Sequence, residues 1–358
     1  MSEHPVWNPL TDWKKCEIKW EKIRISPEEM KQFTGRNNWK GLAQTIGFLL
    51  FFTLTGGLAW LALARQQWVW LAVALYFHGS FYGHFGDALH ELGHSTVFEN
   101  RRLSTFFTVL FGLLYWTWNP HLYRISHTGY HHRYTLHQGS DGEDTPNYLE
   151  FKWRTFYELF IHCLKPKALL INLGRLLTLK PTSYGWHYRG KCALSPWEQF
   201  ILREASEQDR NQVYRFARLA LIVQVVFVIA CIASGLWFLP VLITLAPFYG
   251  AGFHGFMCSA HQHTACEANH PDFRVSCGDA ILDPLSSFLY WHMEYHIEHH
   301  MFASIPCYNL KAFSKYAAAQ LPKKEYSIPR LLKLHGVCRE KYGSWRYWRD
   351  HFGFYKGF

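Results

Sequence analysis

The chain has 358 residues, of which 49% are hydrophobic and 18% aromatic, and its formal net charge is +10. The basic residues are scattered among acidic and aromatic ones, without a long basic tract or a recognised motif, which argues against a nucleic-acid-binding protein. Nine Cys without a C-x-x-C pair argue against a disulfide framework and favour reduced thiols.

The N-terminal half predicts one membrane hairpin. The first 40 residues are polar and Lys-rich, so no cleavable signal peptide is expected. Residues 41–64 carry no charge and are long enough to span a bilayer. Residues 68–86 form a second uncharged run, and we expect this helix to continue without a break into the histidines that follow.

The second predicted hairpin lies further along the chain. Residues 105–118 are apolar but too short to span, so they predict an interfacial or buried helix. Residues 217–236 and 238–258 are two more apolar runs, and the second leads into a polar stretch that contains His261 and His263. Both hairpins are therefore expected to deliver histidines to the same side of the membrane.

The distribution of Lys and Arg predicts the orientation. Eight lie in the segment up to Lys40 and eleven after residue 310, whereas Arg65 alone lies in the two short opposite loops. Under the positive-inside rule, both termini and residues 87–216 face the cytosol. We expect an all-α membrane protein with four transmembrane helices in two hairpins and a cytosolic helical cap that carries the histidines.

This organisation predicts one domain over residues 1–358. It would comprise a cytosolic N-terminal segment (1–40), a catalytic core (41–315) and a cytosolic C-terminal tail (316–358). The expected location is a bacterial inner membrane or the endoplasmic reticulum.

The chain has 22 His, and many of them lie in three clusters. In the first cluster, His90 and His94 are four residues apart and share one face of a helix. The third cluster is expected to place four histidines along one helical face, beginning with His292. The clustered residues are His90 and His94; His127, His131 and His132; and His296, His299 and His300.

Clusters at this spacing predict metal binding. Single histidines near a membrane interface are usually hydrogen-bonding residues, but convergent imidazoles at ligand spacing are typical of metal sites. Eight or more nitrogens exceed what one ion can use, so two ions are implied. Imidazole suits Fe, Zn and Cu alike, and the spacing does not distinguish them.

The pattern H-x3-H, H-x3-H-H, H-x2-H-H, with membrane hairpins before the first and third boxes, resembles the membrane fatty acid desaturase and hydroxylase superfamily over roughly residues 40–315. The resemblance implies two Fe ions, O2 as co-substrate and an external electron donor of the ferredoxin or cytochrome b5 type. By position, the implied ligands are His90, His94, His127, His131, His132, His296, His299 and His300.

The family places a further ligand just after the last span. His263 matches this position best, and His261 is the alternate. His292 is a further alternate, and Asp87 is a candidate for orienting an imidazole or, equally, a helix-end charge. Three acidic residues after the second box are interpreted as solvated or paired with Arg133: Asp141, Glu143 and Asp144.

The resemblance implies an O2-dependent di-iron desaturase that acts on a fatty acyl or related lipid chain. A lipid, alkane or carotenoid hydroxylase or ketolase of the same superfamily is the alternative. A membrane zinc metalloprotease is the rival from another class, because His90-Glu91-Leu92-Gly93-His94 matches H-E-x-x-H, but it leaves the other two boxes unexplained. A metal transporter is disfavoured because the clusters lie beyond the ends of the spans.

Overall fold

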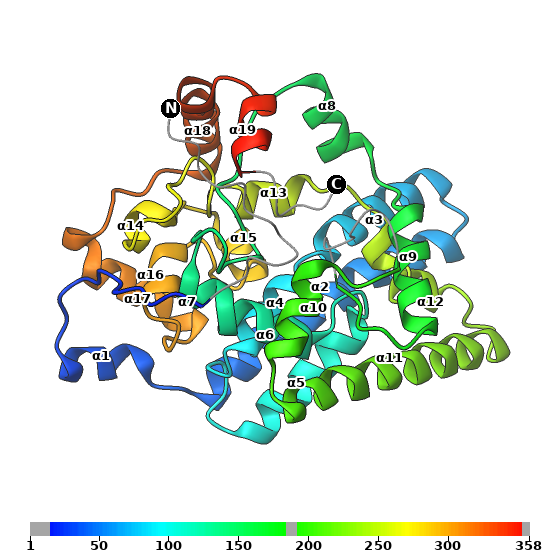
Figure 1. Cartoon of the computed structure of the whole chain (residues 1–358). Coiled ribbons are helices and arrows are strands. Elements are labelled where there is room, and N and C mark those ends of the chain that lie inside the picture. Colours follow the sequence, from blue (N-terminus) through cyan, green and yellow to red (C-terminus); the bar gives the residue numbers. More distant parts are fainter. Residues whose placement is uncertain (1–14, 184–191, 353–358) are drawn as a thin grey trace.

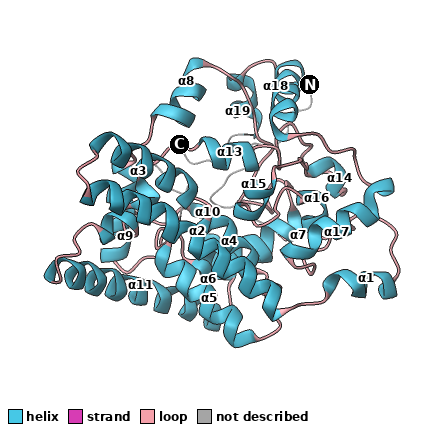
Figure 2. Ribbon diagram, turned by 180° about the vertical axis from the view of Figure 1, so that it is seen from behind, coloured by secondary structure: helices cyan, strands magenta, loops and turns pink. Residues whose placement is uncertain are grey.

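The computed structural model describes residues 15–183 and 192–352 (Figure 1). Within these ranges the regular structure is helical, with isolated β-bridges only (Figure 2). The predicted all-α class is confirmed. The extreme ends of the chain, which we expected in the cytosol, lie outside the described residues.

Two long helices dominate the apolar surface. α2 (Asn38–Ala64) and α11 (Glu207–Ala233) have 27 residues each, or about 40 Å of helix. In the described part of the chain, they alone are long and apolar enough to be candidate membrane spans. Both expose large apolar side chains, among them Leu50 and Leu54 on α2 and Ile222 and Ile229 on α11. α11 lies along the lower edge of the molecule in Figure 1.

The second predicted run is shorter than expected. α3 (Trp68–Tyr82) packs along α2 and ends at Gly83, and α4 (Phe85–Gly93) begins as a separate helix. The expectation of one unbroken helix is therefore wrong. The break occurs at Gly83, because glycine has a low helix propensity.

Residues 238–258 do not form the expected long helix. They form α12 (Leu239–Leu242), a 3-10 turn (Ala246–Phe248) and α13 (Phe253–Ser259). Prolines interrupt the run, and Gly250 has a φ of +91°, which favours glycine. A Cβ on Gly250 would lie 2.2 Å from the Ser80 nitrogen, so the segment packs tightly onto α3.

α5 (Arg101–Leu114) is the buried or interfacial helix that the short apolar run predicted. Asn100 caps its first turn, and Phe107 and Phe111 point into the core. The remaining helices are α1 (Pro27–Thr34), α6 (Pro120–Ser126), η1 (His127–His131), α7 (His132–Tyr134), α8 (Trp153–Phe156), η2 (Tyr157–Ile161), α9 (Pro166–Leu177), α10 (Pro196–Glu204), α14 (Phe273–Ser276), α15 (Pro284–Leu289), α16 (His296–Met301), α17 (Cys307–Ala317), η5 (Ala318–Gln320), α18 (Ser327–Tyr342) and α19 (Trp345–Phe352).

An aromatic core joins the helices that carry the histidines. The Phe48 ring on α2 lies 5.1 Å from Phe85 on α4 and 5.7 Å from Trp291, which precedes α16. Phe111 on α5 completes the cluster. Buried aromatic side chains contribute large apolar areas and defined ring geometries, so this core fixes α4 relative to the segment before α16.

Candidate metal centre

Four segments supply the clustered histidines. α4 carries His90 and is followed at once by His94, and the η1 and α7 turns carry the second cluster. His263 lies in the loop after α13, and α16 carries the third cluster. Residues far apart in the sequence are thereby brought to one buried region.

The nine histidines divide into two groups. In each group the candidate ligand atoms lie within 4.8 Å of one another. The larger group is His90, His94, His127, His132 and His299, and the smaller is His131, His263, His296 and His300. Two groups agree with the inference of two ions.

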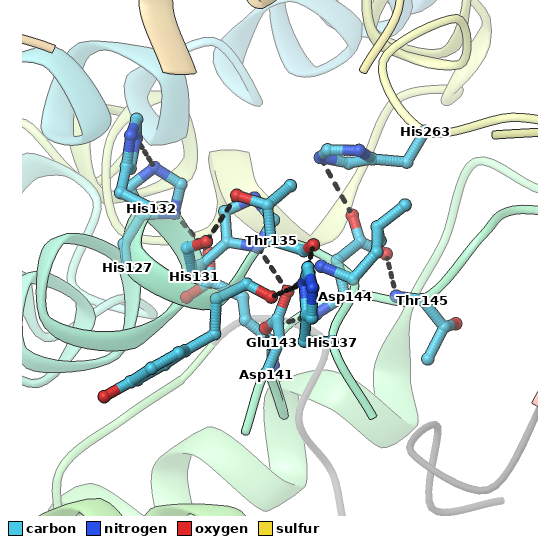
Figure 3. Close-up of polar contacts among 12 residues, drawn as sticks. His127, His131, His132, Thr135, His137, Asp141, Glu143, Asp144, Thr145 and His263 are labelled. Atoms are coloured by element: carbon cyan, nitrogen blue, oxygen red, sulfur yellow. Dashed lines mark hydrogen bonds and ion pairs between the residues drawn. The ribbon is translucent and has the colours of Figure 1, made fainter. Parts of the chain in front are cut away.

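A π-helical turn explains how the second cluster serves both groups. Residues His127–His131 form a π-helix, which places more residues in each turn than an α-helix. His127 and His132, five residues apart, therefore share a side and join the larger group. His131 points to the smaller group and lies beside Asp141 (Figure 3).

The short α16 helix also divides its ligands between the groups. His296 and His300 are four residues apart, face the same way and belong to the smaller group, whereas His299 points to the larger one. The expectation that His292 continues this face is wrong. His292 has a φ of +60° and lies in the turn before α16, where its Nδ1 contacts the Ser287 hydroxyl at 2.9 Å.

Polar partners fix the imidazoles of the larger group. The Tyr123 hydroxyl lies 3.0 Å from His90 Nδ1, and Glu143 Oε1 lies 2.5 Å from His127 Nδ1. Glu91 Oε1 lies 3.2 Å from His299 Nδ1. With Nδ1 turned outward, the Nε2 atoms face inward, where those of His90 and His299 are 2.7 Å apart. Outer partners of this kind orient metal-ligating histidines.

The smaller group is oriented in the same way. Asp141 Oδ2 accepts a hydrogen bond of 2.8 Å from His131 Nδ1, and the Ser276 carbonyl accepts one of 2.9 Å from His263. The Gln262 amide lies 3.1 Å from His296 Nδ1. The Thr135 hydroxyl, which donates to the His131 carbonyl, lies 3.0 Å from His300 Nδ1.

The acidic residues after the second box are not the solvated side chains that the sequence suggested. Asp141 is buried, and Glu143 is largely buried against His127 and Ser126 (Figure 3). Asp144 lies 4.0 Å from His263. These carboxylates pair with histidines and not with Arg133, because the loop from Thr135 folds back over the second cluster.

The remaining candidates lie outside both groups. Asp87 contacts His84 Nδ1 at 2.6 Å, so it does orient an imidazole, but not that of His90. His261 is fully buried, and neither of its ring nitrogens has a hydrogen-bond partner. The sequence analysis did not identify His84 as the partner of Asp87, although the two residues are three positions apart across the start of α4.

The chemistry of the two groups fits metal ions. Several buried ring nitrogens of the grouped histidines have no hydrogen-bond partner, including His94 Nε2, His132 Nδ1 and His300 Nε2. Burial lowers the pKa of His94 to about 4, and the neighbouring His131 adds to this shift. The imidazole is therefore neutral near pH 7, which is the form that binds metals. Unpaired buried nitrogens are costly unless an ion occupies the space between them.

Residues 68–330 match the family model described as fatty acid desaturase. The match includes all nine grouped histidines. A search of curated proteins found no match.

Proposed function

The chain belongs to the fatty acid desaturase family, whose members are non-haem di-iron oxidoreductases, and we propose that it desaturates a fatty acyl or related lipid chain. The observation that carries this proposal is the division of nine histidines, seven buried and two half-buried, into a group of five and a group of four. A protease or other single-metal enzyme would not need the second group.

The proposed cofactor is an iron pair, with the nine grouped histidines as its ligands. When bound, two irons supply the activation of O2 that an unactivated C–H bond requires. The overall reaction removes two hydrogens from adjacent methylenes and, with two electrons and two protons from outside, reduces one O2 to two waters. The alternative, hydroxylation, inserts one oxygen atom and gives an alcohol and one water.

The chain's own residues bind, orient and exclude water. Glu143 and Asp141 hold their histidines in the tautomer that turns Nε2 inward. The aromatic core around Phe48 and Phe85 keeps the membrane side of the centre dry. An apolar cavity of about 310 Å³ lies between α2 and α3, lined among others by Gly56 and Tyr82. It supports a binding site for an apolar chain within the helical bundle.

A second cavity of about 480 Å³ has His94 in its lining. Its lining includes Lys15, Arg124 and Arg133 together with Glu204. The sequence contains no haem-binding motif or cysteine cluster, so an external donor of the ferredoxin or cytochrome b5 type is proposed to supply the electrons.

We propose one membrane domain with both termini in the cytosol. α2 and α11 are its candidate spans, and α3 and residues 239–259 are the proposed return segments. The return segments support a four-crossing arrangement because each leads directly to histidines of the metal centre.

One experiment separates the candidate functions. The chain is expressed in cells, its metal content is measured after purification in detergent, and the cellular lipids are analysed by mass spectrometry. Two irons per chain and new double bonds are expected. New hydroxyl groups would instead favour the hydroxylase, and one zinc with proteolytic activity would favour the protease.

The variant His299→Ala tests the proposed ligands. It should lose desaturation and retain less iron, because it removes a nitrogen that lies 2.7 Å from His90 Nε2 in the larger group. His292→Ala is the matched control from the same segment, since that ring contacts Ser287 and lies outside both groups. Full activity and full iron content in His299→Ala would contradict the assignment.

A further inference from the structure

A third cluster of potential metal ligands lies outside the nine histidines. It comprises His84, between α3 and α4, and His254 and Cys258 on α13. The three ligand atoms lie within 4.8 Å of one another. The residues are at most 7% exposed. Two imidazoles and a thiol at this spacing resemble the ligand set of a mononuclear site.

The outer contacts of the two imidazoles direct their remaining nitrogens to one point. His84 Nδ1 contacts Asp87 Oδ2 at 2.6 Å, and His254 Nε2 contacts the Ser286 hydroxyl at 3.1 Å. His84 Nε2 and His254 Nδ1 then face each other at 2.7 Å. The pairing of His84 with Asp87 repeats the pairing of imidazole and carboxylate that is seen in the nine-histidine centre.

The third ligand comes from the same helix as the second. Cys258 follows His254 by four residues on α13, so the two share a face. Its Sγ lies 4.0 Å from His254 Nδ1. The separation of 2.7 Å between the imidazole nitrogens equals that between His90 Nε2 and His299 Nε2 in the larger group.

We propose that His84, His254 and Cys258 bind one Zn²⁺ ion, with Asp87 orienting the His84 ring. A thiolate with two imidazoles selects zinc over Mg²⁺ or Ca²⁺, which prefer oxygen ligands. Three protein ligands leave a fourth position of the tetrahedron for water. The thiolate and the Asp87 carboxylate together balance the charge of the ion, which a buried site requires.

An ion at this site would connect two distant parts of the chain. His84 and His254 are 170 positions apart, and His84 lies immediately before the helix that carries His90 and His94. The zinc would therefore fix the start of α4 against α13. The competing explanation is that no ion binds and that the contact between His84 Nε2 and His254 Nδ1 is a single hydrogen bond donated by His254.

X-ray absorption at the zinc edge distinguishes these alternatives, because it reports zinc without interference from iron. The full chain is purified in detergent and loaded with iron, and Zn²⁺ is then added as the only further metal. One zinc per chain is expected, with a sulfur neighbour at about 2.3 Å and nitrogen neighbours at about 2.0–2.1 Å.

The variant Cys258→Ser should lose the sulfur neighbour and bind Zn²⁺ at least about a hundredfold more weakly, because the loss of a residue that only orients a ligand already costs about 10–100-fold. Cys338→Ser is the control, since that buried thiol lies on α18 outside all three clusters. If Cys258→Ser fails to fold, the spectrum of the unaltered chain still decides the question.

Zinc with nitrogen neighbours alone, or no retained zinc, would overturn the proposal. A sulfur-bound zinc in a chain that binds no iron would support this site while contradicting the proposed di-iron function.

Discussion

The carboxylates of Asp141 and Glu143 influence the metal centre although neither belongs to its ligand groups. Each accepts a short hydrogen bond from the Nδ1 of a grouped histidine. An imidazole held in this way presents its Nε2 at a fixed angle and is a more basic ligand. The same principle applies to Tyr123 and Thr135, whose hydroxyls contact other grouped histidines.

The variant Asp141→Asn tests this role. It keeps the size of the side chain but removes its charge, so we expect iron affinity of the smaller group to fall by about 10–100-fold. The measurement is the iron retained during dialysis against increasing chelator concentrations. Asp350→Asn, at an exposed position on α19, is the control. Equal iron retention in the two variants would show that Asp141 does not orient a ligand.

The sequence identified the nine grouped histidines but not the residues around them. Eight of them recur at short spacings in three clusters, so they are readable without a structure, whereas His263 was predicted from the resemblance to the family. Asp141 and Glu143 lie ten and sixteen residues from the histidines that they contact, and only the fold of the loop joins them. The separation of His131 from His127 depends on a π-helical turn, which the α-helical spacing rule does not anticipate.

Among the individual elements, α16 is held by a cluster of one lysine and two carboxylates, Lys324, Asp279 and Glu298, which we call the ionic anchor. Lys324, in the loop before α18, contacts Asp279 and, at 2.6 Å, Glu298 Oε1. Glu298 is fully buried and lies between His296 and His299 on the helix, while Asp279 also accepts a hydrogen bond from the Ile297 nitrogen. The anchor therefore fixes the helix that contributes ligands to both groups.

The variant Lys324→Met should destabilise the protein by about 3–5 kcal/mol, because it leaves two buried carboxylates without their cation. The altered position of α16 should also lower the iron content of the protein that remains folded. A loss of overall stability alone would leave that iron content unchanged. Thermal unfolding and metal analysis of the folded protein measure the two effects. Lys333→Met is the control, since its pair with Glu325 is exposed to solvent and contributes little to stability. Similar results for both variants would exclude an anchoring role.

The sequence predicted some helices correctly and others not. Hydropathy indicates that a segment is buried in an apolar environment, but it does not show whether the segment forms one continuous helix. Residues 41–64 are uncharged and uninterrupted, and they form most of α2 as expected. Residues 238–258 are equally apolar, yet Pro240, Pro247 and Gly250 divide them into short pieces that pack against α3. Their apolar character arises from packing against other helices as much as from exposure to lipid.

At the scale of the whole molecule, the exposed apolar surface and the metal centre occupy different regions. Large exposed apolar residues gather on α2, α3 and α11, including Leu54, Trp70 and Ile229, and over residues 151–179. His90 and His94 follow the end of α3 and His263 follows α13, whereas the other grouped histidines lie on η1, α7 and α16. This separation suits an enzyme whose reacting centre lies at the edge of a bilayer, where an apolar chain and polar reactants meet.

The distribution of ligands along the chain predicts that metal removal weakens the entire fold. The grouped histidines extend from His90 to His300, so bound ions connect segments that are separate in the unfolded chain. A ligand that binds only the folded state stabilises it by about 2.7 kcal/mol at a concentration 100-fold above its Kd. We therefore expect a strong chelator to lower the unfolding temperature of the iron-loaded protein by several degrees and added Fe²⁺ to restore it.

The ligand variant provides the control for this experiment. His299→Ala already has an incomplete larger group, so chelation should lower its unfolding temperature by less than that of the unaltered chain. Scans at one fixed heating rate and one detergent concentration keep the comparison valid if unfolding is irreversible. An equal shift in both proteins would mean that the chelator acts elsewhere, and no shift in either would mean that the histidine groups do not couple metal binding to folding.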